Sequence, residues 1–335
     1  MLMSFTWYTK WRINTITSNK PLILKIETTN ICNARCCFCA YERSKRPRTV
    51  LNMDLFDKAL NGYCELGGGP VTLTPVTGDV LLDPYLMQRF DRLKSFSGIT
   101  DVSFTTNLIA HDKLSDTDWS HILRRLRYLQ ISIGGYDSKS YFNMFGVNSF
   151  DKVWAGLHRI SAIKKQSGSG TRLAITLRVP DVKALLESKI TVMLKDLGYD
   201  QISGISSFGN WCGDVDSCNV TMPIQINAPV EKGDCCCMPA LFMAILSNGL
   251  VTGCSCVDHN GDLEIGSLYN DSLSKIWHGM QRMDLCQSFT KVKLYKLCVD
   301  CSSYTSIRTM LTEKYLEGLS LKHLPTKFYD QFGGG

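Results

Sequence analysis

Short apolar runs rich in β-branched residues alternate with longer amphipathic stretches from about residue 20 to residue 206. The clearest helical stretch is Ser149–Gln166, in which apolar residues recur at intervals of three and four. Alternating strands and helices favour a parallel sheet with helical crossovers. Six such units are too few for a closed eight-stranded barrel, so the pattern predicts a partial barrel or an open sheet. The predicted strands are Leu22–Glu27, Val71–Pro75, Asp101–Thr105, Tyr128–Ile133, Arg172–Val179 and Gln201–Ser206.

The alternation stops after about residue 207, where Gly, Asn, Asp and Cys accumulate. Two apolar runs, Phe242–Leu246 and Leu250–Cys254, flank an Asn-Gly turn and therefore predict a pair of strands. We expect a short helix at Leu273–Met283, and an amphipathic helix with a loose tail over Leu311–Gly335. The predicted parts are an α/β domain over residues 1–206, a loop-rich cysteine module over 207–310, and the terminal helix and tail over 311–335.

Charge and hydropathy exclude several classes of protein. The 335 residues include 37 basic and 31 acidic side chains, a mild net charge of +6, and no long basic run that would indicate a nucleic-acid partner. The short basic stretch Arg43–Arg48 is expected to be a solvated loop, with contact to an anionic partner as the alternative.

The longest apolar run, Met238–Leu246, is less than half of the roughly 20 residues that cross a bilayer. Met1–Lys20 lacks the apolar core of a signal peptide, so we expect a cytoplasmic protein without a membrane segment.

The cysteine content is unusual. The chain has 15 cysteines, whereas average composition would give roughly a third of that number. Disulfides do not persist in the reducing cytoplasm. So many thiols in a chain without a signal peptide therefore indicate metal binding or redox chemistry.

The most specific motif is C-x3-C-x2-C, formed by Cys32, Cys36 and Cys39 directly after the first predicted strand. Three thiolates on one short loop can hold three irons of a [4Fe–4S] cluster. The fourth iron is then free to chelate a small molecule through an amine and a carboxylate, as in the binding of S-adenosylmethionine (SAM). Cys37 is expected to be a bystander. A zinc knuckle is the alternative, although it usually needs paired ligands with a fourth nearby.

This motif, at the end of strand one of a partial α/β barrel, resembles the radical SAM superfamily, and Phe38 before the third cysteine also fits. The resemblance implies a partial (β/α)6 barrel that binds a [4Fe–4S] cluster and SAM. It also implies an electron donor such as flavodoxin or ferredoxin. In this family the reduced cluster splits SAM, and the 5′-deoxyadenosyl radical removes hydrogen from an unactivated C–H bond.

Further strand ends extend the resemblance. Thr77-Gly78-Asp79 stands where the family has a Gly-Gly-Glu turn, with the shorter Asp79 in place of Glu. Asn107 ends a segment similar to the family's Thr-Asn-Gly strand end, and Ser132 lies in a segment similar to Ile-Ser-Leu-Asp-Gly. By this resemblance, the cofactor-binding residues are Gly78, Asp79, Asn107, Ser132 and Arg178, the last as a contact for the SAM carboxylate.

A second cysteine pattern follows in the C-terminal module. The module contains one cysteine, followed by a Gly-x4-Cys motif and, further along, a C-x2-C motif. This order resembles the SPASM and twitch extensions of radical SAM enzymes. No cysteine follows Cys301, which favours the shorter twitch form with one auxiliary [4Fe–4S] cluster. The implied ligands are Cys236, Cys254, Cys298 and Cys301, with Cys235 and Cys237 as competing first ligands. Four thiolates would also suit zinc.

Of the remaining cysteines, most are expected to be buried structural thiols. One of them could instead donate a hydrogen atom to a substrate radical, and the candidates are Cys256, Cys212 and Cys218.

The resemblance therefore implies a radical SAM enzyme acting on a peptide or small natural product, in which an auxiliary cluster assists an oxidation such as dehydrogenation or cross-linking. An epimerase with a cysteine hydrogen donor, acting on a peptide or sugar, is the first alternative. A non-catalytic zinc scaffold is the alternative of another class. A role in tRNA or nucleotide modification is weaker, because no basic stripe interleaved with aromatic residues is present.

Overall fold

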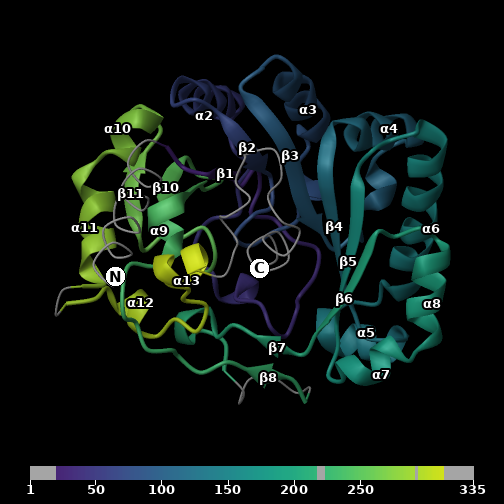
Figure 1. Cartoon of the computed structure of the whole chain (residues 1–335). Helices are drawn as coiled ribbons and strands as arrows, with labels where there is room; N and C mark the ends of the chain where they lie inside the picture. The colour runs from purple at the N-terminus through teal and green to yellow at the C-terminus, as the bar shows by residue number, and fades with distance from the viewer. Residues whose placement is uncertain (1–19, 217–222, 291–292, 313–335) are drawn as a thin grey trace, which may run out of the picture.

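The computed structural model describes residues 20–216, 223–290 and 293–312. Six parallel strands form the first part of a curved sheet, each hydrogen-bonded to the next (Figure 1). They are β1 (Ile23–Ile26), β2 (Gly69–Thr72), β3 (Ile99–Thr106), β4 (Leu126–Gly134), β5 (Arg172–Arg178) and β6 (Gln201–Ile205). The predicted strands are confirmed, although β2 begins and ends earlier than the sequence pattern indicated.

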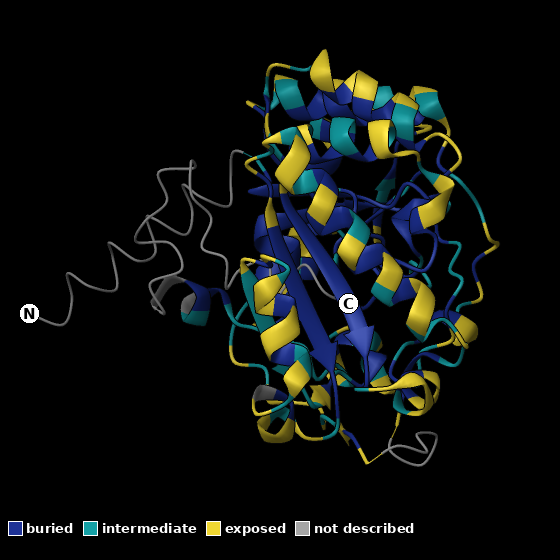
Figure 2. Ribbon diagram, turned by 90° about the vertical axis from the view of Figure 1, so that its right-hand side faces the viewer, coloured by how far each residue is buried: buried dark blue, intermediate teal, exposed yellow. Residues whose placement is uncertain are grey.

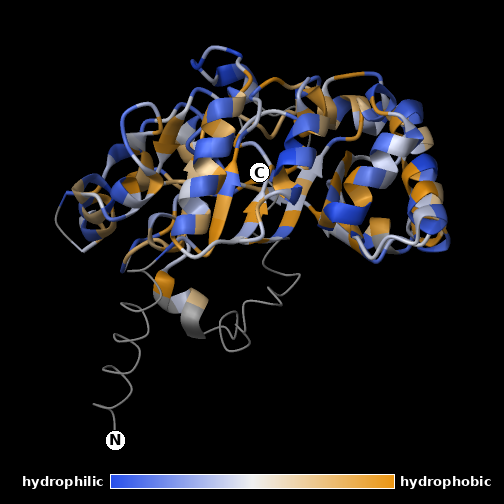
Figure 3. Ribbon diagram, turned by 90° about the horizontal axis from the view of Figure 1, so that it is seen from above, coloured by the Kyte–Doolittle hydropathy of each residue, from blue (hydrophilic) through white to orange (hydrophobic). Residues whose placement is uncertain are grey.

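Helices connect these strands and cover one face of the sheet (Figure 1). In Figure 2 the strands are buried behind helices whose exposed residues lie on their outer sides, and Figure 3 shows the same alternation as hydropathy. The predicted helix at Ser149–Gln166 is confirmed as α6 (Phe150–Ser167), which buries Val153, Leu157 and Ile160. The other helices are α2 (Met53–Glu65), α3 (Leu86–Lys94), α4 (Asp116–Arg125), α5 (Ser138–Phe145), α7 (Val182–Leu186) and α8 (Lys189–Asp196).

The inner face of the strands is polar rather than apolar. Hydroxyl and amide side chains form a hydrogen-bonded row across neighbouring strands, with Gln130 Nε2 donating to Thr176 Oγ1 at 2.6 Å and Thr176 Oγ1 lying 3.2 Å from Ser203 Oγ. On the other side of Gln130 the row continues through Thr105 to Thr74. Polar side chains in a barrel interior do not add to an apolar core, so they favour a binding function for this face.

The cysteine-rich region continues the same sheet. Strand β9 (Phe242–Ile245) pairs in parallel with β1 on the edge opposite β2. Strands β10 (Leu250–Thr252) and β11 (Glu264–Ser267) follow as antiparallel neighbours, and Gly249 takes a positive φ of 79° in the predicted turn. The sheet order is therefore β11-β10-β9-β1-β2-β3-β4-β5-β6. The predicted strand pair is confirmed, and the boundary proposed at residue 206 stays a prediction.

The single helix predicted at Leu273–Met283 is wrong in one respect, because Gly279 is extended and separates α10 (Leu273–Trp277) from α11 (Met280–Ser288).

The remaining elements of the described residues are β7 (Ser207–Phe208), β8 (Gln225–Ile226), α9 (Cys237–Leu241), α12 (Lys296–Val299), α13 (Ile307–Thr312) and four short 3-10 helices, η1 (Tyr41–Arg43), η2 (Val80–Leu82), η3 (His111–Lys113) and η4 (Trp211–Gly213). The predicted terminal helix and tail lie mostly outside the described residues. Among those residues, no helix has the length and apolar character needed to cross a membrane.

Candidate active site and auxiliary site

One cavity gathers the first cysteine motif and all the predicted SAM contacts. It holds about 610 Å³ of atom-free space, part of it open to solvent. Every strand from β1 to β5 contributes through the segment at its carboxyl end, which is where parallel α/β sheets bind their ligands. The predicted residues that line it are Cys32, Cys36, Cys39, Gly78, Asp79, Asn107, Ser132 and Arg178.

The backbone of the cysteine loop is held by the end of α5. Arg35 N donates to Phe145 O at 2.8 Å, and Cys37 N donates to Met144 O at 3.0 Å. Gly146 follows with a positive φ of 68°, and a Cβ at that position would lie 2.5 Å from Arg35 O. The loop can therefore pack closely against the helix end only because residue 146 is glycine. The Cys37 side chain is not among the residues that line the cavity.

The three cavity cysteines are partly buried, and their surroundings disfavour the charged thiolate form. Burial raises the pKa of Cys32 to about 12, and the negative charge of Asp79 adds to that rise. Burial likewise raises the pKa of Cys36 and Cys39, opposed in part by the nearby Arg178 guanidinium. Such thiols ionise when a positively charged metal centre binds them. Three convergent soft ligands fit an iron–sulfur cluster with one iron left open.

The turn after β2 fits closely against this loop. Gly78 has a φ of 135°, and a Cβ there would lie 2.9 Å from Thr29 O. Asp79 N donates to Ile31 O at 2.8 Å, directly before Cys32. The Asp79 carboxylate is buried, and burial raises its pKa to about 6 although backbone and hydroxyl donors oppose the shift. A cationic amine in the cavity would stabilise the ionised form.

The Asp79 carboxylate is also engaged within the protein. It accepts hydrogen bonds from Leu81 N at 3.0 Å, Asn107 N at 2.7 Å and Thr106 Oγ1 at 3.0 Å. The Asp79 side chain, which is shorter than the Glu found in the family at this position, therefore joins the turn after β2 to the end of β3. A direct contact between Asp79 and SAM stays a prediction.

Asn107, Ser132 and Arg178 complete the polar wall. Asn107 Nδ2 donates to Asn33 Oδ1 at 2.9 Å and lies 3.8 Å from Cys32 Sγ. Arg178 Nε donates to Ser132 Oγ at 2.7 Å, and the guanidinium lies 4.7 Å from the centre of the Phe38 ring. Ser132 therefore orients Arg178. The guanidinium is buried close to the thiols, where it can meet an anionic group of a ligand.

A second cavity gathers the cysteines of the C-terminal pattern. Cys236, Cys254, Cys298 and Cys301 all line it, together with apolar side chains such as Leu285. The thiols come from three separate segments that lie next to α9, β10 and α12. Among the described residues, no three His, Cys, Asp or Glu side chains are gathered tightly enough to hold a single metal ion.

The competing first ligands lie elsewhere. The Cys235 thiol donates to Cys236 O at 3.4 Å, and interaction with the Cys286 thiol raises the pKa of Cys235. Interaction with the Cys236 thiol likewise raises the pKa of Cys237. Neither Cys235 nor Cys237 lines the second cavity. The placement therefore favours Cys236 among the three, as the sequence pattern proposed.

The hydrogen-donor candidates that the structure describes both lie beside the second cavity. Cys256 is one of its lining residues. The Cys212 thiol, on η4, donates a hydrogen bond to Cys301, which raises the pKa of Cys212 and lowers that of Cys301. Neither thiol lines the first cavity. Cys218 lies outside the described residues.

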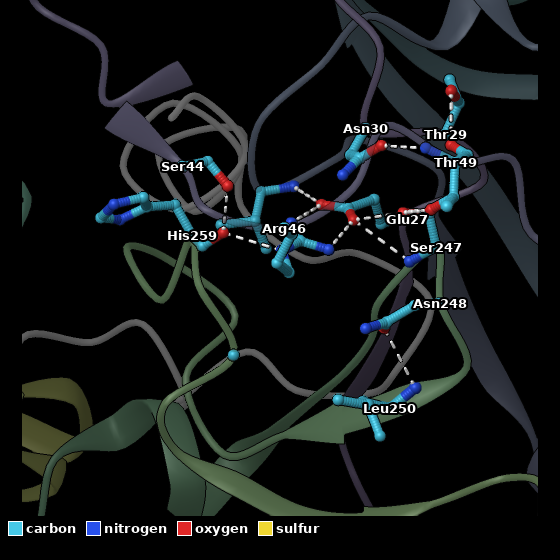
Figure 4. A network of polar contacts seen from close by, with 12 residues as sticks. Glu27, Thr29, Asn30, Ser44, Arg46, Thr49, Ser247, Asn248, Leu250 and His259 are labelled. Carbon is cyan, nitrogen blue, oxygen red and sulfur yellow. Dashed lines mark hydrogen bonds and ion pairs between the residues drawn. The ribbon is translucent and has the colours of Figure 1, made fainter. Parts of the chain in front are cut away.

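A buried polar network that the sequence did not indicate connects the two regions (Figure 4). Glu27, at the end of β1, accepts two hydrogen bonds from Arg46, at 2.6 and 3.1 Å. The same carboxylate accepts from Val76 N after β2 and from Ser247 N and Oγ in the β9–β10 turn. The expected solvated loop at Arg43–Arg48 is therefore wrong for Arg46, whose buried guanidinium also donates to His259 O.

Trp211 forms a further connection that sequence reasoning missed. Its indole Nε1 donates to Phe38 O at 2.8 Å, so η4 is tied to the first cysteine loop. Asn210 ties the same segment to the C-x2-C loop through Asp300 O at 2.7 Å and Ser302 Oγ at 2.8 Å. The sequence could not predict this hydrogen bond, because a tryptophan in a loop-rich segment does not indicate which distant carbonyl its indole will contact.

Fold and site together define an iron–sulfur enzyme built on a partial α/β barrel. The pattern of the radical SAM superfamily matches residues 26–176, and that of an iron–sulfur cluster-binding domain of the SPASM type matches residues 235–302. The chain belongs to the radical SAM superfamily and carries a C-terminal SPASM/twitch-like module. Its cofactors are a [4Fe–4S] cluster, SAM and an auxiliary iron–sulfur cluster, and the zinc-scaffold alternative is set aside.

Curated relatives match less than half of the chain. GTP 3',8-cyclase of Actinobacillus succinogenes is 24% identical over 140 residues, covering 41% of this chain and 40% of that protein. The probable GTP 3',8-cyclase of Sulfurisphaera tokodaii is 29% identical over 134 residues, with 40% and 41% coverage. The match thus spans about 40% of the length of these relatives.

Solved structures share the fold over most of the chain. Streptococcus suis SuiB bound to the precursor peptide SuiA has a TM-score of 0.61 at 12% identity, covering 96% of this chain and 79% of that one. BtrN in complex with AdoMet and 2-DOIA has a TM-score of 0.55 at 14% identity, covering 84% and 92%. At such low identity these likenesses show the fold alone.

Proposed function

We propose that this enzyme uses SAM to abstract hydrogen from a C–H bond of a peptide or small natural product, and that the auxiliary cluster assists a net oxidation such as dehydrogenation or cross-linking. The observation that carries the proposal is the first cavity, where residues drawn from five strand ends surround three thiols. When bound and reduced, the site cluster with SAM supplies a 5′-deoxyadenosyl radical.

The residues of the chain have distinct roles in this proposal. Cys32, Cys36 and Cys39 hold the site cluster, and the closely packed turn at Gly78 fixes the cavity wall beside it. Arg178, oriented by Ser132, meets the SAM carboxylate. The polar groups of Asp79 and Asn107 bind the amine and ribose side of SAM, and Phe38 shields the thiols from water.

The polar interior supports a substrate with hydrogen-bonding groups. Thr74 and Thr105 line the first cavity and begin the row that reaches Gln130, Thr176 and Ser203. Polar side chains of a peptide or the hydroxyls of a sugar-like compound suit this row better than an apolar group does. SuiB with its precursor peptide and BtrN with 2-DOIA have the same fold, which makes both substrate classes reasonable candidates.

The auxiliary site supports the oxidative outcome. The four proposed ligands, Cys236, Cys254, Cys298 and Cys301, line one cavity with Cys256 and apolar neighbours, and four thiolates would saturate a cluster and leave no place for SAM. Such a centre can take an electron from a substrate radical. Epimerisation with a cysteine hydrogen donor is the second candidate; the thiols of Cys212 and Cys256 lie beside the auxiliary cavity rather than in the first cavity, so this outcome would need the substrate to reach between the two sites.

The experiment is an anaerobic assay of the reconstituted protein with a reducing system of flavodoxin or ferredoxin, as found in the cytoplasm. We expect 5′-deoxyadenosine to form, and a true substrate to lose two hydrogens. A product of unchanged composition that gains one deuterium in D2O would instead establish the epimerase. Absence of 5′-deoxyadenosine from a protein with its full iron content would contradict the proposal.

A further inference from the structure

Lys25 is a buried lysine in the middle of the sheet. It lies on β1 between Thr72 of β2 and Ala244 of β9, and only 5% of its surface is exposed. An ammonium group removed from water costs several kcal/mol unless it finds hydrogen bonds and a counter-charge. The surroundings of Lys25 should therefore show what compensates its charge.

The hydrogen bond of Lys25 leads to the auxiliary site. Its Nζ donates to Ser255 O at 2.7 Å, and Ser255 lies between Cys254 and Cys256. Both of these cysteines line the auxiliary cavity. A side chain from the barrel thus reaches the cysteine loop of the C-terminal module, 230 residues away in the sequence.

The obvious carboxylate partner is already engaged. Glu27 shares the face of β1 with Lys25, but it is bound by the Arg46 guanidinium at 2.6 Å. Among the described residues, no carboxylate lies within ion-pair distance of the Lys25 ammonium. Burial lowers the pKa of Lys25, and negative charge on Cys256, Glu27 and Cys254 opposes that shift. Apart from the engaged Glu27, the groups that can balance the ammonium are thus those of the auxiliary site.

We propose that Lys25 is the buried counter-charge of the auxiliary cluster and holds its reduction potential high enough for it to accept an electron. The inference rests on the proposed ligand set of Cys236, Cys254, Cys298 and Cys301. A cluster with four thiolates is net negative and gains one more negative charge on reduction. A nearby cation therefore stabilises the reduced form, and more strongly in a buried site than in water. Lys25 is a positioning residue, because it acts through the cluster.

The chain offers a matched control in Lys232. Its Nζ donates to Val299 O and Cys301 O at 2.9 Å, so it contacts the other cysteine loop of the same site. Lys232 is only half-buried and keeps part of its surface in solvent, whereas Lys25 is buried. Water screens the charge of Lys232, so removing that charge should change the potential much less.

The test is a redox titration of the holoprotein followed by electron paramagnetic resonance, with added SAM to distinguish the site cluster from the auxiliary cluster. In Lys25→Met we expect the auxiliary cluster to be harder to reduce. At the midpoint potential of the parent protein, its ratio of reduced to oxidised cluster should fall about tenfold. For a one-electron couple this corresponds to a midpoint about 59 mV more negative. Lys25→Arg keeps the charge and should stay within about twofold of the parent. Lys232→Met should also stay within about twofold.

Each result decides the proposal. An unchanged auxiliary potential in Lys25→Met with full iron content would overturn it, and so would an equal shift in Lys232→Met. If Lys25→Met loses the auxiliary iron while Lys25→Arg retains it, the need for the charge is supported. Loss in both variants would mean that packing rather than charge is required. Iron for only one cluster in the parent would refute the ligand set itself, which iron and sulfide analysis separates from any failure of Lys25.

Discussion

The two cysteine sites use the same ligand chemistry in opposite surroundings. The first takes three thiols from one short loop and opens into a cavity walled by polar strand ends. The second takes four thiols from three separate segments and packs them among apolar side chains. A site that exchanges a cofactor needs an open position and polar contacts, whereas an electron-transfer site needs saturation and exclusion of water. The difference in surroundings thus separates the two roles before any substrate is known.

The sheet also makes the two sites parts of one body. Strand β9 pairs with β1, Glu27 bridges Arg46 and Ser247, and Trp211 reaches the carbonyl of Phe38. The contacts between the regions are therefore as specific as those within either one. The following changes are designed to break one region, or the connection between them, and leave the rest intact.

The largest effect should come from changing Cys32, Cys36 and Cys39 together to Ala. SAM cleavage should be abolished, because the auxiliary set has no open iron, and about one cluster per chain should remain. Iron and sulfide analysis together with a 5′-deoxyadenosine assay measures both. Iron falling to zero would mean that the C-terminal cysteines do not hold a cluster alone.

The converse change is Cys298→Ala with Cys301→Ala. Product formation should stop while some uncoupled SAM cleavage survives, since the first cavity is untouched. The cluster contributes to the stability of its module, so circular dichroism must first show a folded chain. Turnover at the parent rate in that folded variant would make the auxiliary cluster dispensable.

The connection itself is tested by Glu27→Gln. The amide keeps the shape but leaves the buried Arg46 guanidinium without a counter-charge, which should cost about 3–5 kcal/mol of unfolding free energy. Thermal or denaturant unfolding of the apoprotein measures this. The matched control is Asp112→Asn, whose exposed ion pair with Lys152 should contribute little. Equal losses in both variants would refute the role assigned to burial.

A smaller effect is expected for Arg178→Ala. Loss of a charge-assisted contact should weaken SAM binding about tenfold, or about 1.4 kcal/mol, with less effect on folding. Equilibrium binding of SAM to the reconstituted protein is the measurement. Unchanged affinity in a folded variant would make Arg178 a structural residue, held by Ser132 and packed on Phe38.

The smallest effect should come from Trp211→Phe, which removes one buried hydrogen bond to Phe38 O and should cost about 1 kcal/mol. Trp154→Phe is the control, because the buried Nε1 of Trp154 has no hydrogen-bond partner among the described residues. The two unfolding midpoints should therefore differ by a few degrees. Equal midpoints would mean that the Trp211 hydrogen bond does not stabilise the chain.

Local sequence determined much of this protein. The six barrel strands, helix α6, the turn between β9 and β10 and the three-cysteine loop all follow from patterns within about 20 residues. Periodicity, turn chemistry and ligand spacing act over such short distances, so one stretch of chain is enough to show them. The residues predicted to contact SAM line one cavity, because each ends or follows a recognisable strand, and their contact with SAM stays a prediction.

Only the tertiary structure decided how distant segments meet. The pairing of β9 with β1, the gathering of cysteines from separate segments around one cavity, and the partners of Glu27 and Lys25 depend on residues far apart in the sequence. The sequence LILKIE shows a lysine and a glutamate in an apolar strand, but not what balances their charges. Burial makes those charges consequential, and burial is a property of the packed chain rather than of any segment.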